Sequence, residues 1–467
     1  MNKNELQKFK KLPEGWEKRS LGEVLPILYG KGLTKIERNN DGFYWVYGSS
    51  GKVGKHSKAL TEKPALIIGR KGSVGEVYYS PLPCWPIDTT YYTEEKENVN
   101  LRFFEYLLKG LLLSKLDKST AVPGLSRDDY NNVQVAVAPF NEQHRIVAEI
   151  EKQFSRLDEA VANLKRIKAN LKRYKASVLK AAVEGKLTEE WRKAHPDVEP
   201  ASELLGRILA ERRKKWEEAE LAKMRAKGKG TKDDNWKKKY IESEKPETKG
   251  LPDIPETWQW TRLDTVADIK GGITKDSKQL IENAKELPYL RVANVQRGYL
   301  DLNEIKQIKV PVERLPELLL EKGDILFNEG GDRDKLGRGW IWEGQIGNCT
   351  YQNHVFRARL YLKEIDGKLI SWFGNTFGQK YFMAKGKQTT NLASINKTML
   401  SAFPVPLPPL EEQLQLNKEI EKRMTIISAI EQEVTKNLIR ADRLRQSILK
   451  KAFSGKLVPQ EKTKENG

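Results

Sequence analysis

The sequence predicts an α/β (α+β) fold in two copies, in which two variable domains are separated by two long antiparallel α-helices that form a coiled coil with an internal pseudo-two-fold. Three observations indicate this fold. One amphipathic helix end occurs twice, the two domain starts resemble each other, and short aromatic and β-branched runs alternate with glycine-rich turns ahead of each helix.

The repeated helix is the strongest pattern in the chain. "ASVLKAAVEGKL" at residues 176–187 returns as "QSILKKAFSGKL" at residues 446–457, an offset of 270 (446 − 176). Upstream, "APFNEQHRIVAEIEK" at 138–152 matches "PPLEEQLQLNKEIEK" at 408–422 with the same offset. Matches in the same order and register indicate a duplicated unit.

The two domain starts also match. "LPEGWEKRSLGEV" at 12–24 resembles "IPETWQWTRLDTV" at 254–266 at an offset of 242 (254 − 12), so the second copy has a longer middle. In chain order, the predicted segments are a first domain (1–138), a central helix (139–187), a connector (188–252), a second domain (253–408), a C-terminal helix (409–458) and a disordered tail (459–467).

Proline marks the start of each long helix and glycine marks its end. Pro139 and Pro409 stand where proline is tolerated, in or just before a first helical turn. Gly185 and Gly455 stand where glycine takes the left-handed cap. Each helix covers about 40 residues and should form a rod of roughly 60 Å.

Between these ends, apolar residues recur at spacings typical of a coiled-coil seam. The residues expected to pack between helices are Ile150, Leu157, Leu164, Leu171, Val178, Ile420, Ile427, Val434, Ala441 and Ile448. Phe154, Val161, Tyr174, Met424 and Leu444 fit the same pattern. A small domain cannot bury so long a rod, which favours the other helix as partner. The alternative is that each helix packs separately on its own domain.

The connector begins with a helical pattern that has Leu204 and Ile208 on one face, and continues into a lysine- and glycine-rich stretch. We expect a solvated linker here, although the lysines could follow DNA phosphates. "KPETKGLPDIPE" then forms a proline-punctuated entry to the second domain.

In both variable domains, an apolar strand runs into a polar, basic glycine loop. Such loops bring backbone and guanidinium groups close to a phosphate or a base edge. The predicted DNA-binding residues are Arg70, Lys71, Ser73 and Arg127 in the first domain, and Asn328, Arg333, Lys335, Arg338 and Lys387 in the second. An ordinary hairpin turn is the alternative interpretation of each loop.

The charge of the chain favours a polyanionic partner. With 83 Lys and Arg against 64 Asp and Glu, the formal net charge is +19. Nucleic acid is favoured over a membrane surface as the partner. Solvated surface lysines are the alternative.

Cysteine content and hydropathy predict a cytoplasmic protein. Cys84 and Cys349 are the two cysteines, which excludes a disulfide framework and a multi-cysteine zinc site. The start "MNKNELQKFKK" has no apolar core of a signal peptide. Apolar runs fall short of the ~20 residues that span a bilayer.

Sequence motifs give almost no indication of catalysis. "GSSGKVGKHS" at 48–57 resembles a phosphate-binding loop, but Ser49 replaces the required first glycine and His56 replaces the magnesium-binding Ser or Thr. His56, His144, His195 and His354 lack the spacing of a zinc pair. The chain also lacks a tetrapeptide of the Asn-Pro-Pro-Tyr type that holds a flipped base for methylation. We expect no catalytic residues and no metal site.

Taken together, the doubled "PEGW"-like starts, the "PF-EQ" and "PLEEQ" helix openings, and the ends "EGKLTEEW" and "SGKLVPQ" resemble the specificity subunit of type I restriction-modification systems. The resemblance spans nearly the whole chain. "YGSSGKVG", "IIGRKGSVG" and "WPIDTTYY" look like one kind of target recognition domain, and "GDILFNEGG" and "YQNHVFRARL" like another.

The resemblance implies a subunit without chemistry of its own. Each recognition domain would read half of a bipartite double-stranded DNA target, and the helices would set the spacer between the halves. Two adenine-methyltransferase subunits would dock on the chain and recruit ATP-driven restriction subunits. S-adenosylmethionine, ATP and magnesium would belong to those partners, and this chain would bind no cofactor.

Two other functions fit parts of the sequence. A basic coiled-coil adaptor would bind DNA without sequence preference, but two unlike domains argue against it. The recognition part of another restriction or methylation enzyme would bind a cofactor, but the corresponding motifs are missing from the sequence.

Overall fold

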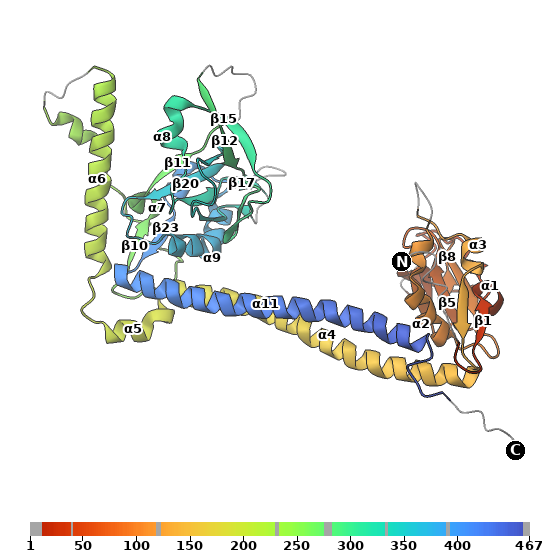
Figure 1. Cartoon of the computed structure of the whole chain (residues 1–467). Helices are drawn as coiled ribbons and strands as arrows, with labels where there is room; N and C mark the ends of the chain where they lie inside the picture. Colours follow the sequence, from red (N-terminus) through yellow and green to blue (C-terminus); the bar gives the residue numbers. More distant parts are fainter. Residues whose placement is uncertain are drawn as a thin grey trace. The chain divides into compact units, whose positions relative to one another are not determined.

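The computed structural model describes residues 12–38, 41–117, 123–228, 233–274, 283–331, 335–388 and 393–460. The chain divides into two compact units, residues 1–168 with 432–467, and residues 169–431. The long helices α4 (Phe140–Val183) and α11 (Leu410–Ala452) contribute to both units (Figure 1). Each unit therefore contains one variable domain and one end of each long helix.

The first domain is built on an antiparallel sheet whose central strand is wholly apolar. Its strands, in spatial order, are β2 (Leu28–Tyr29), β8 (Thr90–Glu94), β5 (Ala65–Gly69) and β6 (Val77–Ser80). Leu66, Ile67 and Ile68 of β5 are fully buried, and each such side chain stabilises the fold by roughly 1.5–3 kcal/mol. The sheet therefore forms the middle of the domain core.

A second sheet and a short ribbon complete this domain. The sheet consists of β4 (Gly51–His56), β3 (Tyr44–Gly48) and β7 (Trp85–Pro86), with β3 antiparallel to β4 and parallel to β7. The ribbon pairs β1 (Glu17–Ser20) with β9 (Gln134–Val137). The helices of this domain are α1 (Leu21–Val24), α2 (Leu101–Leu111) and α3 (Arg127–Asn131).

The second domain repeats this topology strand for strand. Its main sheet has the order β11 (Ala267–Gly271), β20 (Val355–Leu360), β16 (Ile325–Asn328) and β18 (Gly339–Ile341). The second sheet has the order β15 (Lys306–Pro311), β12 (Ala284–Leu290) and β19 (Thr350–Tyr351), and the ribbon pairs β10 (Gln259–Arg262) with β23 (Pro404–Leu407). The duplication therefore extends into the variable domains.

The longer middle of the second copy appears as added elements. These are a hairpin of β13 (Val295–Gln296) and β14 (Tyr299–Leu300), helix α8 (Leu315–Leu318), and a ribbon of β17 (Gly330–Gly331), β22 (Ala393–Ser394) and β21 (Lys387–Gln388). Helices α7 (Leu263–Val266), α9 (Gly367–Lys385) and α10 (Lys397–Ser401) correspond to α1, α2 and α3.

Within each unit the long helices run antiparallel. In the first, Ile150 and Phe154 of α4 share a core with Ile448 and Leu449 of α11. In the second, Leu179 and Ala182 of α4 share a core with Leu416 and Ile420 of α11. The start of one helix therefore packs beside the end of the other in both units, which is the predicted antiparallel arrangement.

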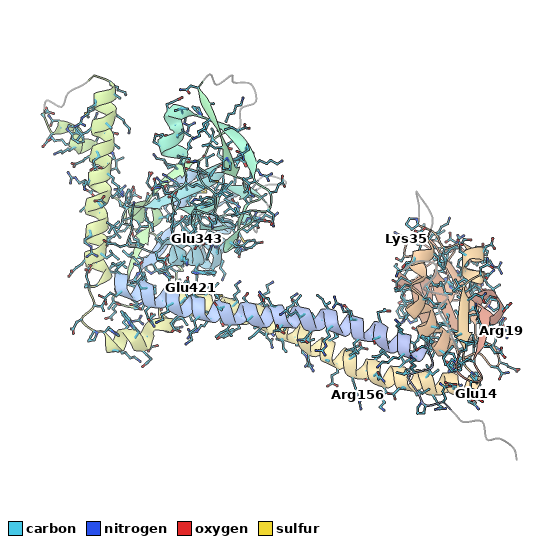
Figure 2. All side chains as sticks on the ribbon, viewed as in Figure 1. Glu14, Arg19, Lys35, Arg156, Glu343 and Glu421 are labelled. Atoms are coloured by element: carbon cyan, nitrogen blue, oxygen red, sulfur yellow. The ribbon has the colours of Figure 1, made fainter. Side chains whose placement is uncertain are left out.

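Fewer residues are buried between the long helices than the sequence pattern predicted. Of the ten residues expected to pack between helices, eight are buried, and Leu157 and Leu164 are half-buried. Tyr174 and Leu444, which fit the same pattern, are 51% and 49% exposed, so their assignment to the seam was wrong. Three residues turn a helix by roughly 300°, which moves these side chains about 60° off the buried stripe. Charged side chains such as Arg156 and Glu421 cover exposed faces (Figure 2).

The connector begins as a helix with an apolar face, as its sequence pattern predicted. It contains α5 (Glu189–Ala194) and α6 (Ala201–Ala226), and Leu204 and Ile208 of α6 are buried in the core of the second domain. The Ala201 amide also donates to the Thr257 carbonyl at 3.1 Å. The first half of α6 is thus part of the second unit, because it packs against α7 and β10.

Each domain is attached to a long helix by a buried glutamate. In the first unit, Glu142 accepts from the Trp16 indole at 3.0 Å and from the Gln460 amide at 2.9 Å. Residues 459 and 460, which we assigned to a disordered tail, are therefore held in place, and 461–467 lie outside the described residues. This contact ties the chain after α11 to the start of the first domain.

The second unit repeats the attachment with a charged partner. Glu412 is fully buried and accepts from the Trp258 indole at 2.8 Å and from the Thr188 hydroxyl at 2.6 Å. The Arg192 guanidinium forms an ion pair with the same carboxylate. Glu142 and Glu412 are related by the same offset as the repeated helix ends, so the attachment belongs to the duplicated unit.

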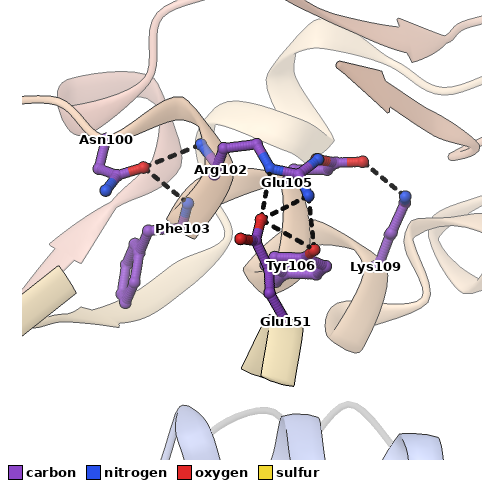
Figure 3. Close-up of polar contacts among 7 residues, drawn as sticks. All are labelled: Asn100, Arg102, Phe103, Glu105, Tyr106, Lys109 and Glu151. Carbon is purple, nitrogen blue, oxygen red and sulfur yellow. Dashed lines mark hydrogen bonds and ion pairs between the residues drawn. The ribbon is translucent and has the colours of Figure 1, made fainter. Parts of the chain in front are cut away.

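A second polar contact joins α2 to α4 in the first unit (Figure 3). Asn100 caps α2 by accepting from the amides of Arg102 and Phe103. Arg102 donates to the Glu151 carboxylate of α4 at 2.6 Å, and burial raises the pKa of the adjacent Tyr106 to about 12. In the second unit Lys368 of α9 donates to Glu421, which matches Glu151 at the offset of the repeat.

Among the residues that the structure describes, no helix is long and apolar enough to cross a bilayer.

Candidate nucleic-acid interface

The loop after β5 presents Arg70 on an aromatic platform. The Arg70 guanidinium lies 5.3 Å from the Tyr29 ring and 5.8 Å from the Tyr91 ring, and donates to the Asp88 carbonyl at 2.9 Å. The Arg127 guanidinium lies 5.9 Å from the same Tyr29 ring. The structure thus brings together two of the predicted DNA-binding arginines, and Tyr29, which sequence reasoning missed, is half exposed beside them.

Tight backbone packing shapes this loop. A Cβ on Gly69 would lie 2.1 Å from the Ser73 carbonyl oxygen, and one on Gly75 would lie 2.5 Å from the Ser114 amide nitrogen. Glycine is therefore required at both positions. The loop that results directs Lys71 to solvent and leaves Ser73 half exposed.

Tyr91 forms the fixed floor of the cluster. Its hydroxyl donates to the Leu125 carbonyl at 3.0 Å. Burial, and next the neighbouring Tyr29, raises the pKa of Tyr91 to about 12. A neutral, anchored ring keeps the Arg70 guanidinium in one orientation, which suits an arginine that contacts a base edge or a phosphate.

A second basic and aromatic group lies on the β3–β4 hairpin. Trp45 is 37% exposed, and the ammonium groups of Lys52 and Lys55 lie 4.2 and 5.0 Å from its ring centroid. The turn of this hairpin adjoins the Arg70 loop, since a Cβ on Gly72 would lie 3.3 Å from the Ser49 hydroxyl. Sequence reasoning missed Trp45, although "FYWVYGSSGKVGK" does mix aromatic and basic residues.

Two of the predicted contacts in the second domain are structural. Asn328 is fully buried and donates to the carbonyls of Val292 and Val295 at 3.2 and 2.8 Å. Arg338 is 9% exposed and donates to the Val292 carbonyl at 3.1 Å. Their assignment to a DNA surface needs correction, because both side chains hold the inserted segment around β13 onto β16.

The other predicted contacts of this domain are less defined. Lys335 is half-buried, and a Cβ on Gly331 would lie 3.7 Å from its side chain. Arg333 lies outside the described residues. Lys387 belongs to β21, but its side chain is also outside the described part of the structure.

An acidic residue stands at the centre of the second loop. Glu329 directly follows β16, and its carboxylate lies 2.6 Å from Nδ1 of His354. The His354 side chain is 55% exposed and that of Glu329 is 29% exposed. Sequence reasoning missed this pair, because 25 residues separate its members.

Within the described ranges, no group of three or more His, Cys, Asp and Glu side chains is placed to hold a metal ion.

Comparison with protein families gives one match over most of the chain. The family described as "Type I restriction modification DNA specificity domain" matches residues 13–173 and 255–440. These two segments cover both variable domains and most of both long helices.

Similar proteins cover almost the full length. The chain is 25% identical over 456 residues to the type I restriction enzyme EcoDI specificity subunit of Escherichia coli, covering 96% of this chain and 90% of that protein. It is 20% identical over 465 residues to the type I restriction enzyme MjaVIII specificity subunit of Methanocaldococcus jannaschii, covering 96% and 94%.

Solved structures share the fold. The HsdS subunit of Thermoanaerobacter tengcongensis aligns with a TM-score of 0.50 at 17% identity, over 96% of this chain and 99% of that one. A chain from a study of complex assembly and conformational transition of the type I R-M system aligns with a TM-score of 0.57 at 18% identity, over 96% and 99%.

Proposed function

The chain belongs to the family of type I restriction-modification specificity subunits, and on that premise we propose that it recognises a bipartite sequence in double-stranded DNA. Each variable domain reads one half-site. One observation carries this proposal: the two domains share strand order and backbone pairing, while the side chains on their equivalent loops differ. A common scaffold with unlike loops is what two unlike half-sites require.

The first half-site is contacted by the Arg70 loop and the β3–β4 hairpin. Arg70, Lys71 and Arg127 supply charge-assisted donors to phosphates or to guanine edges. Tyr29 adds exposed aromatic surface beside Arg70 and Arg127, and Trp45 adds it beside Lys52 and Lys55. Phosphate contacts of this kind make affinity depend on salt concentration.

We further propose that the long helices set the spacer. α4 has 44 residues and α11 has 43, each without a break in its helix. A helix of this length spans roughly 66 Å. Half-sites on one face of DNA are separated by about 34 Å, one turn of the double helix, or by a multiple of that distance. A paired, continuous helix accepts one spacing, whereas a flexible linker would accept several.

Exposed apolar residues on these helices provide docking positions for partners. Tyr174 on α4 and Leu444 on α11 occupy equivalent positions of the repeat and are exposed to nearly the same extent. We propose that two methyltransferase subunits bind at these repeated positions and recruit the restriction subunits. S-adenosylmethionine, ATP and magnesium then belong to the partners, and this chain contributes recognition alone.

The test is to map methylated adenines in DNA from cells that express the chain with its methyltransferase subunits. The expected result is a split motif of two short half-sites with a fixed spacer. Exchanging residues 12–138 for the equivalent domain of another specificity subunit should change one half-site and leave the other and the spacer unaltered. A contiguous motif, or methylation without a motif, would contradict the proposal and favour a non-specific adaptor.

A further inference from the structure

The loops after β5 and β16 are equivalent residue by residue. The Arg70 amide donates to the Thr89 carbonyl at 2.9 Å, and the Glu329 amide donates to the His354 carbonyl at 3.0 Å. Downstream, the Leu125 amide donates to the Arg70 carbonyl at 2.9 Å, and the Ile395 amide donates to the Glu329 carbonyl at 2.8 Å. Leu125 and Ile395 are themselves related by the offset of the repeat, so Glu329 takes the place of Arg70.

The chemistry at this shared position is reversed between the domains. Arg70 offers donors from a guanidinium held against two tyrosine rings. Glu329 offers a carboxylate, whose oxygens can only accept while it is ionised. The His354 imidazole, 2.6 Å away, holds one carboxylate oxygen, and none of the described residues donates to the second, which is left for another donor.

A carboxylate here cannot bind the DNA backbone, because phosphates repel it. In the major groove, however, the exocyclic amino groups of cytosine (N4) and adenine (N6) are donors that Glu or Asp can accept. Because the backbone of this loop is held in place, its carboxylate cannot move away from the phosphates of bound DNA. An acidic residue without a role in binding would therefore weaken the affinity. Its best use there is base recognition.

Building on the proposed function, we propose that Glu329, oriented by His354, accepts a hydrogen bond from the amino group of a cytosine or adenine in the second half-site. The two domains then read DNA with opposite hydrogen-bond polarity. Arg70 donates to acceptors in one half-site, and Glu329 accepts from a donor in the other. His354 acts as a positioning residue.

The test uses the full chain in complex with its methyltransferase subunits and duplexes that carry the mapped motif. In the second half-site, each cytosine is replaced in turn by 2-pyrimidinone and each adenine by purine, which removes one amino group at a time. For the wild type, one replacement should weaken binding by roughly 5- to 150-fold. That position identifies whether the base is cytosine or adenine.

Glu329→Ala, which has no side-chain acceptor, should bind the natural and the amino-less duplex equally at this position. It should keep its discrimination at every other position, including the whole first half-site. His354→Asn should lose part of this discrimination, since the carboxylate remains but is less constrained. Glu313→Ala, which removes an exposed carboxylate elsewhere in the same domain, is the matched control and should behave as the wild type.

Unchanged discrimination by Glu329→Ala would overturn the proposal. Loss of binding to all duplexes by both Glu329→Ala and Glu329→Asp would also overturn it, because this would indicate a structural role. A wild-type complex without any split motif would instead remove the proposed function, so the two failures are distinguishable.

Discussion

Replacing Glu412 by glutamine should destabilise the second unit more than the equivalent Glu142→Gln change destabilises the first. Glu412 is fully buried and is bound by the Trp258 indole, the Thr188 hydroxyl and the Arg192 guanidinium. Glutamine keeps the shape of the side chain but removes its charge. Its amide nitrogen must also face at least one of these donors.

The magnitude follows from the partners. Removing one member of a buried ion pair costs about 3–5 kcal/mol, and a hydrogen bond to a charged group contributes about 1.5–3 kcal/mol. The Arg192 side chain is 19% exposed and keeps some solvation, which places the loss near the lower end, about 3 kcal/mol. Among the described residues, Glu142 accepts from the neutral donors Trp16 and Gln460, so replacing it should cost about 1–2 kcal/mol.

The assay is native-state hydrogen exchange followed by mass spectrometry on the full chain. Peptides from 410–425 report on Glu412 and peptides from 140–155 report on Glu142. Exchange is preferable to a melting curve, because a chain with two units need not unfold in one step. Each variant also serves as the control for the other, since protection should fall only around the altered glutamate.

An equal loss in the two variants, or a larger one for Glu142→Gln, would refute the argument that the charged partner dominates. A double-mutant cycle with Arg192→Gln provides a second check. The coupling energy between Glu412 and Arg192 should be at least about 1 kcal/mol by the same reasoning, and a value near zero would assign the stability to Trp258 and Thr188 instead.

Three further changes test other parts of the molecule. Arg70→Ala with Lys71→Ala should weaken DNA binding and reduce the salt slope by about 2, as titrations at several salt concentrations would show, whereas unaltered affinity would remove the loop from the interface. Inserting four residues after Leu164 and four after Val434 lengthens both helices by ~6 Å. The accepted spacer should grow by about two base pairs at ~3.4 Å each, and an unchanged motif would refute the spacer role. Tyr351→Phe should be neutral or stabilising by about 1 kcal/mol, because the Tyr351 hydroxyl has no hydrogen-bond partner among the described residues. Burial raises the pKa of Tyr351 from about 10 to about 12, because the folded state disfavours the charged phenolate. The stability of the fold is therefore unaffected by this group below pH 10 and falls as pH rises from 10 towards 12. The phenylalanine variant should lose less stability in that window, as denaturant titrations at pH 9 and 11.5 would measure.

The sequence predicted the helices well because their determinants are local and repeated. Gly185 and Gly455 have φ angles of +67° and +68°, as expected for left-handed caps. Their second role was not visible in the sequence. A Cβ on Gly185 would lie 2.4 Å from Pro255, and one on Gly455 would lie 2.2 Å from Pro13. Each glycine therefore also allows the start of a domain to pack closely against the end of a long helix.

The binding loops were harder to predict, because exposure depends on what packs over them. Asn328 and Arg338 look like loop residues in the chain, but the inserted segment near Val292 covers them. Arg70 and Lys71 have no such cover and lie at the surface or partly exposed. Glu329 was overlooked because a search for basic residues cannot find a reader that accepts hydrogen bonds.

The paired attachments also bear on the order in which the parts of the chain are connected. Gln460, which follows α11, binds Glu142 in the first unit, and Thr188 and Arg192, which follow α4, bind Glu412 in the second. The segment after α4 continues directly into the connector. The same contacts would therefore form in a circularly permuted protein in which a short peptide joins residue 460 to residue 12 and the chain is opened after α6. Chain order can thus be rearranged while the architecture persists.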